Sequence, residues 1–138
     1  MELIVTIVVI AAAVSAVLAI VSATAAHSAD NLLQAQGVVI GESYLNEILS
    51  KPYGTDSGPC ARALMDEAGD YNGLRDVGAH DQTGTAVPQL GAYTVAVGVT
   101  NSTLGAPPAA VPAELITVTV TAPNGQSIVL SGYRMQYP

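Results

Sequence analysis

An uninterrupted apolar segment near the start of the chain constrains its fold more than any other feature. Residues 3–26 form a run of 24 residues without a charge, interrupted only by the hydroxyl side chains of two serines and two threonines. As a helix, this run is about 36 Å long at roughly 1.5 Å per residue, and a bilayer core is about 30 Å thick. The segment is therefore long enough to cross a membrane, and the remaining residues suffice for one small domain.

Three interpretations of this segment compete. A cleavable signal peptide needs a basic start, an apolar stretch of about 7 to 15 residues and a cleavage site of small residues. The Ala-His-Ser-Ala sequence before Asp30 resembles such a site, but no Lys or Arg precedes Lys51, and Glu2 stands where positive charge belongs. The run is also too long. A plain membrane anchor and the first part of a longer helix are the other two interpretations.

The sequence after residue 27 favours the longer helix, because the apolar character continues as a one-sided stripe. The stripe recurs at spacings of three and four and consists of Leu33, Gly37, Ile40, Gly41, Tyr44 and Ile48. Polar residues occupy the other side, and the first proline is Pro52. We therefore predict one helix of about 48 residues, apolar over residues 1–26 and amphipathic over 27–51, followed by a head at 52–138.

Two glycines lie on this stripe, four residues apart. Gly37 and Gly41 each cost about 1 kcal/mol relative to alanine in a helix interior. Close approach of the head to the helix is the favoured explanation for them, and a point where the helix bends or locally unwinds is the alternative. In either case we expect the stripe to be the face that packs on the head.

The head contains patterns typical of an antiparallel sheet. Residues 93–100 alternate between valine or tyrosine and small or polar residues, and residues 116–121 and 127–133 also alternate. Pro123-Asn124-Gly125 between the last two runs predicts a hairpin with Gly125 in the left-handed region. Residues 52–59 are predicted as a loop, 61–67 as one short helix and 101–113 as an irregular connection. The expected fold is α+β, with three or four strands packed on the helical stripe.

Composition excludes several partners. The chain has four basic and eleven acidic residues, for a net charge of −7, and the basic residues form no cluster. Nucleic acid and anionic lipid surfaces both require clustered Lys or Arg, so neither is an expected partner. Cys60 is the single cysteine and has no partner for a disulfide within the chain. The sequence has no nucleophile elbow and no phosphate-binding glycine loop, so we expect a protein without enzymatic activity.

One acidic stretch is a candidate metal site. Asp70, Asn72, Asp76 and Asp81 supply oxygen atoms of the kind that calcium prefers, but the spacing lacks the glycine and closing glutamate of an EF-hand. A solvated acidic loop is the favoured interpretation, with calcium as the alternative and no other metal or cofactor expected.

The first ten residues, Met-Glu-Leu-Ile-Val-Thr-Ile-Val-Val-Ile, resemble the N-terminal segment of type IV prepilins. In that family a glutamate stands at the fifth mature position of an apolar helix and pairs with the free N-terminal amine of a neighbouring subunit. Glu2 matches this glutamate, which implies that Met1 corresponds to the fourth mature position and that the family's leader and first three mature residues precede it. The resemblance thus implies a pilin fold, with Glu2 as an assembly contact.

Motifs in the rest of the chain are similar to the MshD group of MSHA minor pilins and pilus-modification proteins. They include Glu42-Ser-Tyr-Leu-Asn-Glu-Ile-Leu, Asp70-Tyr-Asn-Gly-Leu-Arg-Asp-Val-Gly-Ala-His-Asp-Gln and Ile128-Val-Leu-Ser-Gly-Tyr-Arg. The resemblance implies a major or minor filament subunit that serves adhesion or motility. It also implies storage in the bacterial inner membrane with the head in the periplasm, followed by assembly with other subunits into an extracellular pilus. A minor pseudopilin of type II secretion and a membrane-tethered binding module that does not polymerise are the alternatives.

Overall fold

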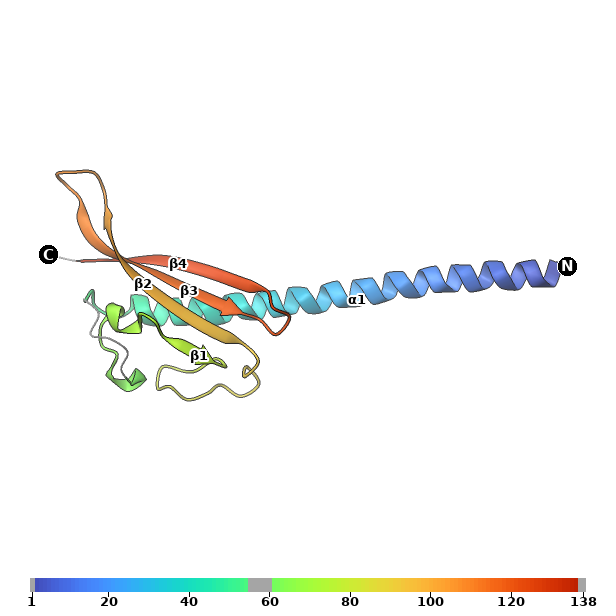
Figure 1. Cartoon of the computed structure of the whole chain (residues 1–138), viewed down its shortest axis with the longest axis horizontal. Helices are drawn as coiled ribbons and strands as arrows, with labels where there is room; N and C mark the ends of the chain where they lie inside the picture. Colours follow the sequence, from blue (N-terminus) through green and yellow to red (C-terminus); the bar gives the residue numbers. More distant parts are fainter. Residues whose placement is uncertain (1, 55–60, 137–138) are drawn as a thin grey trace. The chain divides into compact units, whose positions relative to one another are not determined.

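The computed structural model describes residues 2–54 and 61–136, with only the backbone described over 25–29. Its elements in chain order are α1 (Glu2–Leu49), the short 3-10 helices η1 (Arg62–Leu64) and η2 (Ala68–Tyr71), and the strands β1 (Arg75–Val77), β2 (Thr94–Leu104), β3 (Val111–Thr121) and β4 (Ser127–Met135) (Figure 1). The predicted α+β class is confirmed. Met1, Cys60 and most of the predicted loop 52–59 lie outside the described residues.

The predicted long helix is confirmed, since α1 runs for 48 residues from Glu2 to Leu49. It ends where expected: the Ser50 and Lys51 N–H groups donate to carbonyls of the last turn, and Pro52 follows. The chain divides into two compact units, Met1–Leu33 and Gln34–Pro138, so that α1 contributes to both. The second unit contains the C-terminal part of α1 and the whole sheet.

The four strands form one antiparallel sheet in the order β1-β2-β3-β4, in which each strand pairs with the next one along the chain (Figure 1). The register brings Val97, Val118 and Leu130 into one row across β2, β3 and β4. Side chains of this row's face are buried over residues 95–99 of β2 and 114–120 of β3, whereas alternate residues on the opposite face are largely half-buried or exposed. The alternation of apolar and polar residues in these runs therefore corresponds to a sheet that is covered on one face only.

The strands are longer than the sequence predicts. The prediction of an irregular connection at 101–113 is therefore wrong for most of that range. β2 continues to Leu104 and β3 begins at Val111, so that only residues 105–110 join them. Pro112 is compatible with a strand because it is the second residue of β3, where its carbonyl still accepts a hydrogen bond from the Gln136 N–H. The predicted hairpin turn is confirmed: Gly125 has a φ of 82°, and its N–H donates to Ala122 O at 2.9 Å.

The short helix predicted for 61–67 is shorter than expected: only η1, a single 3-10 turn, lies within that range. A second 3-10 turn, η2, follows directly after the predicted range. The carboxylate of Asp70 accepts hydrogen bonds from the backbone N–H groups of Asp66 and Glu67, which lie between the two turns. A side chain that bonds to the backbone in this way competes with continued helix. Strand β1, which follows η2, has only three residues and was not predicted.

Candidate functional site

The N-terminal half of α1 is the first candidate functional surface. Residues 2–24 form a helix long and apolar enough to cross a membrane, and every one of these side chains is exposed. Three of its hydroxyl groups, those of Thr6, Ser15 and Thr24, each donate to the carbonyl oxygen four residues earlier. These three hydroxyl groups are satisfied within the helix, so they add no unpaired donor to a segment placed in hydrocarbon.

The predicted assembly contact, Glu2, lies in the first turn of α1 with its side chain exposed. A carboxylate in this position interacts favourably with the positive end of the helix dipole, which explains why a charge is compatible with the start of α1. The same position leaves the carboxylate accessible to a positively charged group of another molecule.

The glycines of α1 are close to the sheet. A Cβ atom added to Gly37 would overlap the Ile128 side chain, and one added to Gly41 would lie 2.7 Å from Leu130 Cδ1. Both contacts are made by β4. These contacts agree with the predicted close approach of the head to the helix at the two glycines. On the strand side, Gly132 has a matching role, since a Cβ there would lie 3.2 Å from Leu49 Cδ1.

The structure buries most of the predicted packing stripe. Gly37, Ile40, Gly41, Tyr44 and Ile48 are all buried in the second unit. Leu33, the remaining member, is half-buried and is the last residue of the first unit. The sequence pattern missed Glu47, which is 7% exposed, although its position one residue before Ile48 places it at the edge of the stripe.

Glu47 belongs to a buried ionic network that fastens the segment after α1 to the helix. The Arg62 guanidinium donates to Glu47 Oε2 at 2.8 Å and to Asp76 Oδ2 at 2.6 Å. The side chains of Arg62 and Glu47 are 7% and 6% exposed, so the charges are largely removed from water. Arg62 therefore connects α1 to β1 through two carboxylates that are far apart in the sequence.

Two tyrosines complete this network. The Tyr71 hydroxyl donates to Glu47 Oε1 at 2.9 Å, and the Tyr44 hydroxyl donates to Asp76 Oδ2 at 2.7 Å while accepting from the His80 N–H at 2.8 Å. Burial, together with the hydrogen bond to Asp76, raises the pKa of Tyr44 to about 12. Burial and the bond to Glu47 likewise raise the pKa of Tyr71. Both phenols remain protonated donors at neutral pH, as a structural anchor requires.

The four predicted calcium residues are not assembled as a metal-binding group. Asp76 bonds to Arg62 and Tyr44. Asp81 accepts hydrogen bonds from the Thr83 hydroxyl and from the Thr85 and Thr83 N–H groups within its own turn, which lowers the pKa of its carboxyl. The Asp70 carboxylate binds backbone N–H groups, as described above, and Asn72 Oδ1 accepts from the Val99 N–H. Within residues 2–54 and 61–136, no group of three or more His, Cys, Asp or Glu side chains is placed to hold a metal ion.

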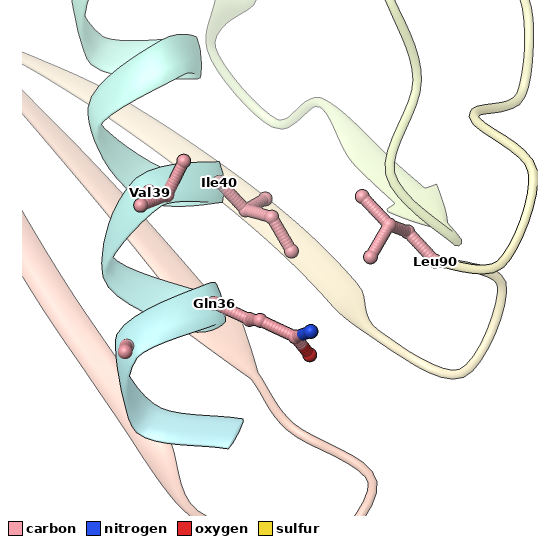
Figure 2. Close-up of a pocket in the computed structure, with 5 residues that line it drawn as sticks. Gln36, Val39, Ile40 and Leu90 are labelled. Carbon is pink, nitrogen blue, oxygen red and sulfur yellow. The ribbon is translucent and has the colours of Figure 1, made fainter. Parts of the chain in front are cut away.

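The second unit also has an apolar groove of about 270 Å³, lined by Ala35, Gln36, Val39, Ile40 and Leu90. Figure 2 shows Leu90 reaching from its loop toward the side of α1 that carries Ile40 and Gln36. The Gln36 amide oxygen accepts a hydrogen bond from the Tyr93 hydroxyl at 2.7 Å, which holds this side of the groove. Val39 is 65% exposed, so the groove is open to an apolar group from outside.

The fold and these surfaces define a class: an α+β protein whose apolar N-terminal helix is able to span a membrane. No protein-family model, curated protein or solved structure matches the chain.

Proposed function

We propose that this protein is a type IV pilin-like subunit of the MSHA type, a major or minor component of an extracellular filament used in adhesion or motility. The observation that carries the proposal is the division of α1. Residues 3–24 carry no charge and are all exposed, whereas the same helix continues beneath a sheet that buries its other end. A helix with one exposed apolar half and one half packed on a sheet suits a subunit that is first held in a membrane and then packed among the helices of its neighbours.

The need to cover the first half of α1 supports this function. Its large side chains are between 52% and 77% exposed, and burying such a side chain is worth about 1.5–3 kcal/mol. A bilayer supplies this burial for a single subunit, and neighbouring apolar helices supply it in a filament. We accordingly propose the inner membrane, with the head in the periplasm, as the location before assembly, and other pilin subunits as the partners after it.

Glu2 is the proposed registry contact. A carboxylate enclosed among apolar helices is stable only when paired, and removal of one partner of a buried ion pair costs about 3–5 kcal/mol. In the pilin family the partner is the N-terminal amine of a neighbouring subunit. Glu2 is exposed at the start of α1 and so is accessible for this pairing. The pairing selects one position of each helix relative to the next.

A second candidate function, a membrane-tethered binding module, is favoured by the apolar groove beside Leu90 (Figure 2). In this case the apolar helix serves as an anchor, the head binds an apolar group, and no polymer forms. The two functions differ in their dependence on Glu2, because an anchor does not require a paired carboxylate.

The test replaces Glu2 in cells that carry the pilus assembly machinery. For Glu2→Gln we expect filaments on the cell surface, counted by electron microscopy, to fall at least about tenfold, while the amount of protein in the membrane fraction stays the same. Glu42→Gln is the matched control, because Glu42 is an exposed carboxylate on the same helix. Filaments that persist in the Glu2 variant at wild-type numbers would refute the registry role and favour the anchor.

A further inference from the structure

Besides Asp70, another acidic side chain is buried in the head away from the Arg62 network. Glu114 on β3 is 1% exposed. The register places it between Asn101 on β2 and Arg134 on β4, in a row across the sheet. Glu114 alternates in phase with the buried Ile116, so its side chain belongs to the covered face. An acid in phase with a buried apolar run is the sequence signal that identifies this position.

The carboxylate of Glu114 is only partly satisfied. The Gly54 N–H donates a hydrogen bond to it, but none of the described residues bonds to Oε2. Arg134 does not form an ion pair with it within the described part of the chain, although it is the neighbour in the register. Burial raises the pKa of Glu114 and the nearby charge of Glu67 also raises it, whereas the Gly54 hydrogen bond and the positive charge of Arg134 lower it without cancelling the rise. A buried carboxylate in this condition is costly unless a positive charge compensates it.

Glu114 lines a polar cavity of about 130 Å³. The other lining residues are Gly69, Asn72, Val99 and Asn101. The polar side chains among them are one carboxylate and two carboxamides, and the Asn72 oxygen already accepts from the Val99 N–H. The potential ligands are therefore the oxygen atoms of Glu114 and Asn101, and neither histidine nor cysteine lines the cavity. Hard cations such as calcium prefer this donor set, whereas zinc prefers nitrogen and sulfur.

We propose that the cavity between η2 and the β2–β3 strands binds a hard divalent cation, with Glu114 as its charged ligand, Asn101 as a neutral ligand at the rim and water in the remaining positions. A volume of 130 Å³ accommodates an ion with several waters at about 30 Å³ each. With a single carboxylate in the cavity, the affinity belongs to the weak range, with Kd of about 0.1–1 mM. The net charge of −7 raises the concentration of cations near the protein.

The test uses the full chain in uncharged detergent micelles after treatment with a chelator, and the probe is calcium. At about 10 mM calcium we expect the thermal midpoint to rise by about 5 °C or more, because the folded state alone has the site. Sodium chloride at equal ionic strength serves as the control for general screening. No rise with calcium, or an equal rise with sodium, would overturn the proposal.

Two variants connect the response to this cavity. Glu114→Gln keeps the size and the acceptor oxygen but removes the charge, so its calcium response is expected to disappear. Glu42→Gln makes the same charge change at an exposed site on α1 and is expected to respond like the wild type. An unchanged response of Glu114→Gln would overturn the proposal.

A gain of affinity provides an independent measurement, which holds even where Glu114→Gln does not fold. Asn101 is exposed at the rim, so Asn101→Asp adds a second carboxylate without a burial cost. We expect calorimetric titration to give a Kd for calcium at least about threefold lower than that of the wild type, since ligand charge tunes the affinity of such sites. An unchanged or higher Kd would contradict the assignment of Asn101.

Discussion

Arg62 is the residue whose environment is most restrictive. Its guanidinium lies between two carboxylates on elements that are distant in the sequence, and its central carbon lies 4.6 Å from the centre of the Tyr44 ring. A lysine lacks the planar fork needed to reach both acids while stacking on the ring. The network therefore depends on this one arginine more than on any of its partners.

Replacing Arg62 by methionine is expected to destabilise the protein by about 3–5 kcal/mol, because the buried Glu47 and the half-buried Asp76 then lose their cation. Chemical unfolding of the full chain in micelles measures this loss. Arg75→Met is the matched control, since Arg75 is exposed on β1, and we expect a change within about 0.5 kcal/mol for it. Similar losses for the two variants would mean that the network contributes nothing particular to stability.

Tyr44 predicts how stability depends on alkaline pH. Its folded-state pKa is about 12, and an unfolded tyrosine titrates near pH 10. Since the folded pKa is the higher one, the contribution is fully present below about pH 10 and is lost as the pH rises from about 10 to 12. Urea unfolding across this range should show a falling free energy, with a smaller slope in Tyr44→Phe. An equal slope in the variant would contradict the assignment.

At the scale of elements, the contact between α1 and β4 depends on the absence of side chains. Gly41 lies against Leu130 and Val120, and Gly132 lies against the leucines of the last turns of α1. This arrangement lets a helix and a strand approach one another more closely than ordinary side chains allow. Gly37 and Gly41 therefore serve packing in the structure, at the cost of helix propensity.

Gly41→Leu is expected to destabilise the head by about 1–3 kcal/mol, because the new side chain meets Leu130 in a packed interface. Ser43→Leu provides the control, since Ser43 is exposed on the same helix. Shortening the opposing side chain in the double variant Gly41→Leu/Leu130→Ala should recover part of the loss, as measured by a double-mutant cycle in thermal unfolding. Strictly additive effects would show that the two residues do not compete for the same space.

At the scale of the whole molecule, the chain combines an apolar helix able to span a membrane with an acidic head. The charge of −7 lies entirely outside residues 3–26, which carry none. This separation permits one part to enter hydrocarbon while the other remains in water. Membrane association should therefore depend on the helix and be insensitive to charge on the sheet.

A charge placed in the middle of the apolar half tests this division. Val14→Asp should raise the free energy of insertion by about 2.5–3.5 kcal/mol and sharply lower the fraction of protein that resists alkaline extraction from membranes. Ser131→Asp adds the same charge at an exposed position of β4 and should leave this fraction unchanged. Equal retention of both variants would indicate that the helix is not what holds the protein in the membrane.

The sequence by itself determined the elements whose signals are local. The long helix, its end before Pro52, the alternating strands and the left-handed Gly125 all follow from periodicity and backbone preference between near neighbours. The ends of β2 and β3 did not follow, because polar residues such as Asn101 are tolerated in strands once the partner strand supplies hydrogen bonds.

Only the tertiary structure decided which polar residues meet. Glu47, Arg62 and Asp76 are separated by up to 29 positions, and no periodic pattern relates them. The same applies to Glu114 and its cavity, where η2 and two strands converge. The physical reason is that a buried charge is stable only beside a compensating partner. The distance between such partners is set by the positions of the helix and the sheet, which the apolar pattern determines first.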